Sequence, residues 1–219
     1  MKDAIFFDCD GVLVDSEPLS ARTTADILAT HGIEMSWQEA NDIFIGKSMK
    51  DALALVHASC GVSLPASFVE AHEALLFQRF EADLRPIDGI AALLCEIDRP
   101  RCITSNSTHR RLAVTLSTTG LGAFFQENVF SAEDVAQGKP APDLFLHAAR
   151  VMGADIAKCT VIDDNVSGIQ AAIAAGARAI GFTGGSHVAW DQADRLHAAG
   201  ACCVAANAPA LLSALRAAA

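Results

Sequence analysis

The sequence predicts an α/β protein in which a parallel sheet is flanked by helices and an all-helical domain is inserted after the first strand. Short apolar or β-branched runs alternate with longer helical patterns, and such continuous runs are typical of strands buried on both faces of a parallel sheet. The alternation breaks at residues 16–84, where only helical patterns occur. We therefore expect a catalytic core formed by residues 1–15 and 85–219, and a small helical domain of residues 16–84.

Six runs are expected to form the strands of the core. They lie at residues 4–8, 101–105, 128–131, 159–163, 177–182 and 201–205. Helical patterns follow several of these runs, which indicates βαβ units with right-handed crossovers. The expected core helices lie at residues 107–118, 142–152, 166–175 and 190–199.

The inserted domain reads as four helices joined by turns. They are expected at residues 16–31, 36–44, 49–59 and 66–82. Ser36 and Ser48 stand where N-caps of two of these helices are expected, because a hydroxyl side chain can accept a bond from a free N–H group of the first turn. Pro65 is expected to open the last helix, since proline fits the first turn.

The composition excludes several classes of partner. A net charge of −10, from 16 basic and 26 acidic residues, disfavours nucleic acid and anionic membranes, because both need a basic surface. No apolar stretch approaches the length of a membrane span. The seven cysteines show neither the spacing of a zinc site nor a disulfide framework. We expect a reduced, cytoplasmic protein that is a monomer or a weak homodimer.

Two of the expected strands end on paired carboxylates. Asp8 and Asp10 end the first strand and, being two residues apart, can face the same way. Asp163 and Asp164 end the strand at residues 159–163. Four acids at buried strand ends would repel one another unless a cation lay between them, and oxygen ligands suit Mg²⁺. A solvated strand end or a polar loop before a helix would explain one such pair, but not two.

Two further segments offer groups that suit an anion. Ser105 and Asn106 follow a strand and precede a helix, so that hydroxyl, amide and helix N-terminal N–H groups could form an anion cradle. An ordinary helix cap is the more common meaning of such a sequence. Lys139 lies between Gly138 and Pro140, in a stiff loop that could present a cation to a phosphate. A solvated loop lysine is the simpler alternative.

Taken together and in this order, four segments resemble the haloacid dehalogenase superfamily of hydrolases, specifically its phosphatase and β-phosphoglucomutase-like branch. The segments read "DCDGVLVDSE", "TSN", "KPAPDLF" and "IDDNVSGIQAA". The resemblance covers nearly the whole chain, and it implies a Rossmann-like core in which the insert is a helical cap. The fourth segment departs slightly from the usual pattern, with Asn165 where serine is common and Asp163 where glutamate is frequent.

The resemblance also implies the roles of the catalytic residues. Asp8 would be the nucleophile that forms an aspartyl-phosphate. Asp10 would protonate the leaving alkoxide and then activate water. Lys139 would act in catalysis by stabilising the charge of the transferring phosphoryl group.

The same resemblance implies a set of metal-binding and phosphate-binding residues. The Mg²⁺ site would comprise Asp8, Asp10 through its backbone carbonyl, Asp164 as a direct ligand, and Asp163 directly or through water. The phosphoryl oxygens would be held by Ser105, Asn106 and Lys139.

The expected function is that of a Mg²⁺-dependent phosphatase acting on a small phosphorylated metabolite, a sugar or sugar-acid phosphate. Asp10 favours phosphate esters over haloacids, because a halide leaves without a proton whereas an alkoxide needs one. The alternatives are a β-phosphoglucomutase-like phosphomutase and a catalytically idle binding module. The intact set of acids and Lys139 disfavours the idle module.

The cap sequence bears on the choice between phosphatase and mutase. Mutases of the branch carry a histidine, an arginine and a lysine at positions where this chain has Ser20, Met49 and no lysine on its last cap helix, although Arg79 could substitute. We therefore expect hydrolysis. Lys47 or Lys50, before and at the start of a cap helix, is expected to contact the distal part of the substrate, and a solvated lysine is an equal alternative for either.

Overall fold

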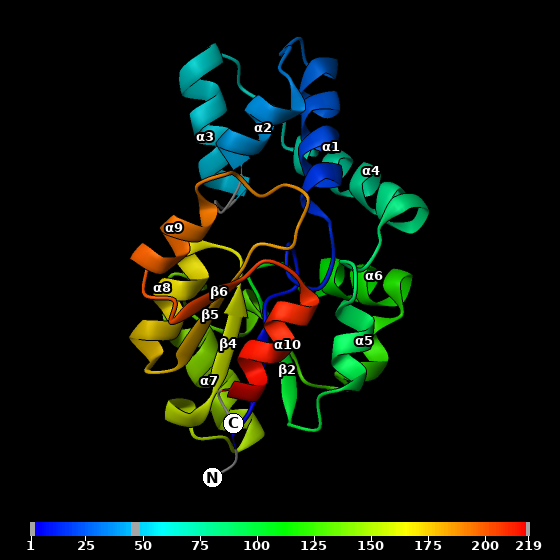
Figure 1. Cartoon of the computed structure of the whole chain (residues 1–219). Helices are drawn as coiled ribbons and strands as arrows, with labels where there is room; N and C mark the ends of the chain where they lie inside the picture. The colour runs from blue at the N-terminus through cyan, green and yellow to red at the C-terminus, as the bar shows by residue number, and fades with distance from the viewer. Residues whose placement is uncertain (1–2, 45–48, 218–219) are drawn as a thin grey trace. The chain divides into compact units, whose positions relative to one another are not determined.

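The computed structural model describes residues 3–44 and 49–217, except for the side chains of residues 49–51. The chain divides into two compact units, one formed by residues 1–15 with 85–219 and the other by residues 16–84. Each unit is described separately below (Figure 1). Within the described residues, no helix has the length and apolar character needed to cross a membrane.

The first unit is built on a six-stranded parallel sheet with the strand order β3-β2-β1-β4-β5-β6. Its strands are β1 (Ile5–Phe7), β2 (Arg101–Ser105), β3 (Val129–Ser131), β4 (Thr160–Asp163), β5 (Arg178–Phe182) and β6 (Cys203–Ala205). All six expected strands are confirmed. Because the chain order reverses direction at β1 and β4, the carboxyl ends of these two neighbours form the switch point where open α/β sheets bind ligands.

Helices connect the strands of this unit. They are α5 (Ile90–Cys95), α6 (His109–Thr119), α7 (Asp143–Met152), α8 (Val166–Ala175), α9 (Gln192–Ala198) and α10 (Ala208–Ala217), with short 3₁₀ turns η1 (Leu121–Phe124), η2 (Ala132–Asp134) and η3 (Ile156–Lys158). The four expected core helices are confirmed.

Two of these helices, α5 and α10, are not expected from the sequence. Helix α5 has only 6 residues, which is too short for a clear helical period. Asn207, Pro209 and Arg216 interrupt the apolar, alanine-rich sequence near the end of the chain, but Asn207 and Pro209 form the beginning of α10. The Asn207 side chain accepts a hydrogen bond from the Ala210 N–H group at 3.0 Å, as an N-cap does, and Pro209 occupies the first turn, where its missing N–H has no consequence.

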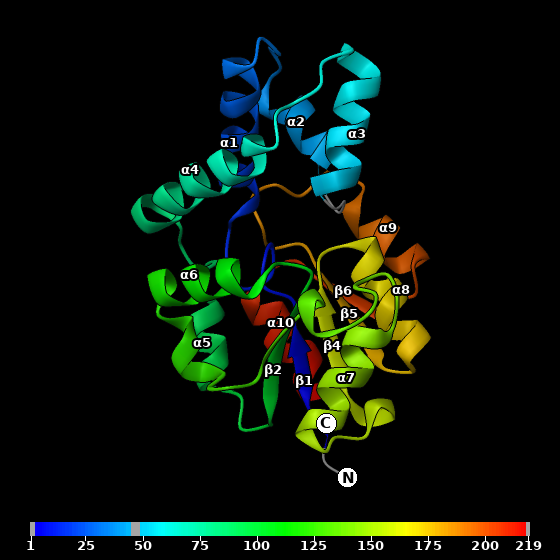
Figure 2. The same ribbon diagram turned by 180° about the vertical axis from the view of Figure 1, so that it is seen from behind.

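Strand β1 is covered on both faces, as its uninterrupted apolar sequence predicts. The Phe6 ring stacks on Phe145 of α7 at a centroid distance of 6.3 Å, and the Phe7 ring contacts Phe125 at 5.9 Å. Residues of α7, α8 and α9 share one hydrophobic cluster with Phe6, whereas α5 packs against α10 (Figure 2). The end of β1 is therefore fixed in a packed three-layer core.

The second unit consists of helices only, as expected. They are α1 (Glu17–Thr30), α2 (Trp37–Phe44), α3 (Met49–Cys60) and α4 (Ser67–Asp83). Leu28, Ile33, Val56 and Phe68 form its buried centre. A buried hydrogen bond between Thr24 Oγ1 and His72 Nε2, 2.9 Å long, adds a polar link between α1 and α4.

Two of the three residues that were predicted to begin helices of this unit lie within the described residues. Ser36 forms a capping box with Glu39: the Glu39 N–H donates to Ser36 Oγ at 3.2 Å, and the Ser36 N–H donates to Glu39 Oε2 at 2.7 Å. Ser48 lies outside the described residues. Pro65 stands two residues before the first residue of α4, and its carbonyl accepts from the Phe68 N–H group.

Candidate active site

The register between β1 and β4 places the predicted acids side by side. Phe7 is paired with Ile162, so the next residue of each strand, Asp8 and Asp163, lies at the same edge of the sheet. Oxygen atoms of Asp8, Asp163 and Asp164 all lie within 4.8 Å of one another, and the three residues are buried. The structure thus brings three of the four predicted acids into one cluster.

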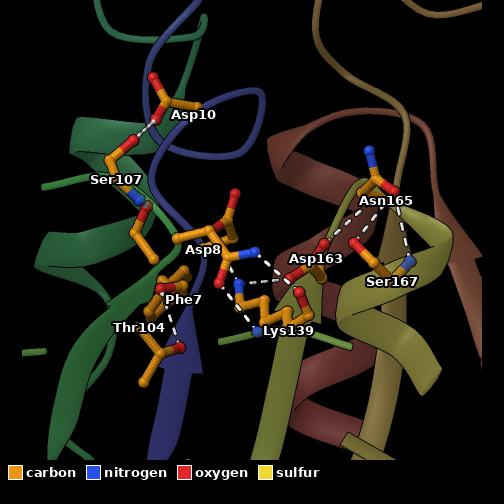
Figure 3. A network of polar contacts seen from close by, with 11 residues as sticks. Phe7, Asp8, Asp10, Thr104, Ser107, Lys139, Asp163, Asn165 and Ser167 are labelled. Carbon is orange, nitrogen blue, oxygen red and sulfur yellow. Dashed lines mark hydrogen bonds and ion pairs between the residues drawn. The ribbon is translucent and has the colours of Figure 1, made fainter. Parts of the chain in front are cut away.

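Lys139 reaches this cluster from the loop before α7. Its Nζ donates to Asp8 Oδ1 at 2.8 Å and to Asp163 Oδ2 at 2.7 Å (Figure 3). Burial by itself lowers the pKa of Lys139, but the charges of Asp163 and Asp8 outweigh this effect and leave the pKa above its ordinary value. Lys139 is therefore a permanent cation within the site, and the alternative of a solvated loop lysine is wrong.

The cluster carries more negative charge than Lys139 compensates. Burial raises the pKa of Asp8 well above its ordinary value, Lys139 acts in the opposite direction, and Asp163 and Asp164 add repulsion. Burial also raises the pKa of Asp164, although a hydrogen bond with His187 lowers it. Buried oxygen donors whose ionised forms are unfavourable fit a hard divalent cation, which would stabilise those forms. The cluster could therefore hold a metal ion.

Gly168 makes room for the Asp163 carboxylate. A Cβ atom at this position would lie 1.8 Å from Asp163 Oδ2, which is far inside contact distance. Asp163 Oδ1 also accepts from the Asn165 N–H group at 2.9 Å, and Asn165 caps α8 by accepting from the Ser167 N–H group at 3.2 Å. Gly168 therefore leaves the space that the Asp163 carboxylate occupies. The N-cap residue Asn165 and Asp163 belong to the same turn.

Asp10 belongs to a different polar group. Its Oδ2 accepts from Ser107 Oγ at 2.7 Å, and its Oδ1 accepts from Arg111 Nη2 at 2.8 Å. Figure 3 shows its carboxylate turned toward Ser107. The Asp10 side chain is not among the clustered acids, and the expectation that its backbone carbonyl faces a metal stays a prediction.

The residues of the second motif differ in what their side chains do. Ser105 is buried at the end of β2, and its Oγ accepts from the Ser107 N–H group at 3.1 Å. The Asn106 amide binds the backbone of Lys139 twice, accepting from its N–H and donating to its carbonyl, both at 2.9 Å. The Asn106 side chain thus holds the Lys139 loop in place, a contact that its expected role as a phosphate ligand does not foresee.

Three side chains that lie next to the predicted site were not identified from the sequence. Ser107 and Arg111 follow the second motif by one and five residues, and their contacts with Asp10 are visible only in the fold. His187 Nε2 lies 3.0 Å from Asp164 Oδ2, although the spacing of the histidines gives no sign of it. His109, which follows the second motif by three residues, pairs instead with Asp134 at 2.8 Å and is half exposed.

The two lysines expected to contact substrate are not placed by the structure. Lys47 lies outside the described residues, and so does the side chain of Lys50, which belongs to the first turn of α3. Their role stays a prediction.

Comparisons with known proteins all point to the same family. Residues 2–176 match the family of haloacid dehalogenase-like hydrolases. The 6-phosphogluconate phosphatase of Escherichia coli K12 is 32% identical over 186 residues, which cover 84% of each chain. A haloacid dehalogenase-like protein of unknown function from Agrobacterium tumefaciens is 40% identical, with a TM-score of 0.87 and 99% of each chain covered.

A second solved structure is that of a family hydrolase from Deinococcus radiodurans with bound phosphate and sodium. It is 32% identical, its TM-score is 0.83, and the match covers 99% of this chain and 96% of the other. Sequence motifs, sheet topology and relatives therefore agree that this chain belongs to the haloacid dehalogenase-like hydrolases.

Proposed function

We propose that the chain is a Mg²⁺-dependent phosphatase that hydrolyses a sugar or sugar-acid phosphate through an aspartyl-phosphate. The observation that carries this proposal is the buried cluster of Asp8, Asp163 and Asp164 at the switch point of the sheet, in which the ammonium group of Lys139 binds Asp8 and Asp163. The predicted enzyme class, a phosphoric monoester hydrolase, is confirmed by the family and by the phosphatase among its relatives. The residue units 1–15 with 85–219 would form the catalytic core, and residues 16–84 the cap.

Asp8 would be the nucleophile. One of its carboxylate oxygens attacks phosphorus, the bond to the leaving oxygen breaks, and an aspartyl-phosphate forms. A water molecule then attacks the same phosphorus, the bond to Asp8 breaks, and phosphate leaves. Lys139 favours the ionised, nucleophilic form of Asp8 and would balance the charge that builds up on the phosphoryl oxygens.

Asp10 would move the two protons of this cycle. It donates a proton to the leaving alkoxide in the first half and takes a proton from the attacking water in the second. Ser107 and Arg111 hold its carboxylate, and the guanidinium group is a charge partner for the ionised form. A second aspartate with its own partners can thus serve as acid and base while Asp8 serves as nucleophile.

A Mg²⁺ ion would be held by Asp8, Asp164, the backbone carbonyl of Asp10, and Asp163 directly or through water. When bound, such an ion supplies positive charge that draws the substrate phosphate to Asp8 and stabilises its developing charge. Ser105, Asn106 through its backbone, and Lys139 would hold the remaining phosphoryl oxygens. The side chain of Asn106 would act by fixing the backbone of Lys139.

The substrate class rests on charge and on the relatives. The net charge of −10 gives the whole molecule no attraction for an anion, so the local cations would have to bind it. The E. coli relative is a 6-phosphogluconate phosphatase, and we extend its class of substrate, a phosphorylated sugar acid, to this chain. A cytoplasmic location and a monomeric or weakly dimeric state stay predictions.

A phosphomutase is the second candidate, and one contact bears on it. Arg79, the cap residue that could replace the lysine of a mutase, pairs with Asp26 at 2.5 Å and donates to Thr23 Oγ1 at 3.1 Å. These partners lie on α1 of the same unit, so the Arg79 side chain links α4 to α1 within the cap. This supports hydrolysis over phosphoryl return to a second hydroxyl.

The direct test combines a substrate panel with a nucleophile variant. We expect phosphate release from at least one sugar or sugar-acid phosphate in the presence of Mg²⁺, and its loss when EDTA is added. Asp8→Asn should lower turnover at least about 10³-fold, because an amide oxygen cannot form the acyl-phosphate. Asp98→Asn, an exposed aspartate outside the site, is the matched control and should keep full activity. Near-normal turnover of the Asp8 variant would contradict the mechanism.

A further inference from the structure

The loop between β5 and α9, residues 183–191, packs against one member of the acid cluster. His187 Nε2 lies 3.0 Å from Asp164 Oδ2, and the side chains of His187 and Asp164 are only 5% and 8% exposed. The side chain of Gln192, the first residue of α9, donates to the backbone carbonyl of Asp164 at 2.6 Å. Asp164 is therefore held at both its carboxylate and its backbone by a segment that follows it by more than 20 residues.

Two glycines leave the space that this contact requires. A Cβ atom at Gly11 would lie 2.1 Å from Asp164 Oδ2 and 3.0 Å from His187 Cε1. A Cβ atom at Gly185 would lie 2.8 Å from the His187 ring. The imidazole thus fits between the backbone after β1 and the backbone of its own loop, and its orientation is fixed by packing on both sides.

The same loop is also attached at a third point. The Ser186 N–H group donates to Asp15 Oδ1 at 3.0 Å, immediately before the chain enters the helical insert. The residue before His187 is thus tied to the segment that carries Asp8 and Asp10. A side chain held by a loop with several such attachments can orient its neighbour reproducibly.

The two adjacent acids of the fourth motif have different partners. Asp163 is bound by the ammonium group of Lys139, whereas Asp164 is bound by an imidazole ring. A carboxylate that binds a cation is ionised and only accepts hydrogen bonds, so in the metal-bound protein the contact with Asp164 requires the hydrogen on Nε2 of His187. The accepting oxygen keeps further lone pairs, and a ring N–H that fixes a carboxylate is a common outer partner of metal ligands.

We propose that His187 is a positioning residue for the metal site: its ring N–H holds the Asp164 carboxylate in the orientation that binds the divalent cation. His187 itself is not a ligand, because its Nε2 is directed at the carboxylate and the clustered donor atoms of the described residues come from Asp8, Asp163 and Asp164. The inference rests on the proposed function, since it takes Asp164 as a metal ligand.

The test uses binding of Mn²⁺ to the full-length protein, followed by electron paramagnetic resonance at fixed pH. His187→Asn should weaken Mn²⁺ binding about 10–100-fold, because the shorter amide cannot reach Asp164. His187→Gln places an amide N–H close to the position of Nε2 and should restore most of the affinity. Turnover of the Asn variant should recover at saturating Mg²⁺, since a positioning residue affects the affinity for the metal and not the chemical step.

Two controls separate the possible failures. His109→Asn removes a similar histidine–aspartate pair that lies outside the acid cluster, and it should leave Mn²⁺ affinity unchanged. Asp164→Asn should abolish tight binding. If both His187 variants bind Mn²⁺ as the natural protein does while Asp164→Asn does not, the positioning role is wrong and the proposed function stands. If Asp164→Asn binds Mn²⁺ normally, the proposed metal site itself is wrong, and the role of His187 falls with it.

Discussion

Asp8 and Asp10 are two residues apart in the sequence, yet they belong to different electrostatic environments. Asp8 is buried against Lys139 and close to two other acids, whereas Asp10 is held by a hydroxyl group and a guanidinium group. Two carboxyl groups in unlike surroundings can carry unlike roles in one reaction. Partners from other segments thus give the two aspartates the different surroundings that the proposed roles of nucleophile and proton carrier require.

This division makes a prediction for Asp10→Asn. The variant should slow the first half-reaction of an alkyl phosphate about 10²–10⁴-fold, because the alkoxide then leaves without a proton donor. With p-nitrophenyl phosphate the leaving phenolate needs little protonation, so release of nitrophenolate in the first turnover should change much less. Single-turnover measurements on both substrates test this, since they exclude the second half-reaction, in which Asp10 is expected to act as base. Equal losses on the two substrates would remove Asp10 as the acid.

At the scale of elements, the site depends on how closely α8 approaches the end of β4. Gly168 lies in the first turn of α8, directly over the Asp163 carboxylate. Helix propensity alone favours alanine at such a position by about 0.5–1 kcal/mol. The Cβ atom that alanine adds, however, would overlap the carboxylate and force the helix or the acid to move.

We therefore predict that Gly168→Ala lowers the free energy of unfolding by about 1–3 kcal/mol, the usual range for overpacking, instead of raising it. The displaced Asp163 should also weaken its contact with Lys139, so turnover should fall. Chemical denaturation and phosphate release measure the two effects. Gln170→Ala, at an exposed position of the same helix, is the control and should leave both nearly unchanged. A Gly168 variant that is more stable and fully active would contradict this account of the glycine.

The elements themselves could largely be predicted, because their signals are local. Each of the six strands is a continuous apolar run between polar turns, and the helical insert stands out because strand signals are missing from it. Helix α5 was not predicted because it is too short to show a helical period. Helix α10 was not predicted because Asn207 and Pro209 suggest an interruption of the sequence, whereas in the structure they begin the helix. Short or unusually started elements depend on tertiary packing, which a local pattern does not contain.

At the scale of the whole molecule, the candidate site could be predicted only in part. The acids of the first and fourth motifs could be found because the members of each pair lie within two residues of each other in the sequence. The contact of His187 with Asp164, and that of Asn106 with the Lys139 backbone, join residues 23 and 33 positions apart. Neither contact has a characteristic spacing, since it depends on how loops meet at the edge of the sheet. The residues that position the site therefore become visible only with the fold.

The whole molecule also decides whether the phosphoryl group passes to water or to a second hydroxyl. A mutase must exclude water from the aspartyl-phosphate while a bisphosphate intermediate turns around, which requires polar groups of the cap on the substrate. In this chain Ser20 stands where a mutase carries histidine, and Arg79 is engaged with Asp26 within the cap. We predict that β-glucose 1-phosphate, incubated with a trace of the 1,6-bisphosphate, yields free phosphate without faster formation of glucose 6-phosphate. Asp8→Asn provides the blank for both products. Glucose 6-phosphate that accumulates much faster than phosphate would identify a mutase, because water would then be the minor acceptor of the phosphoryl group.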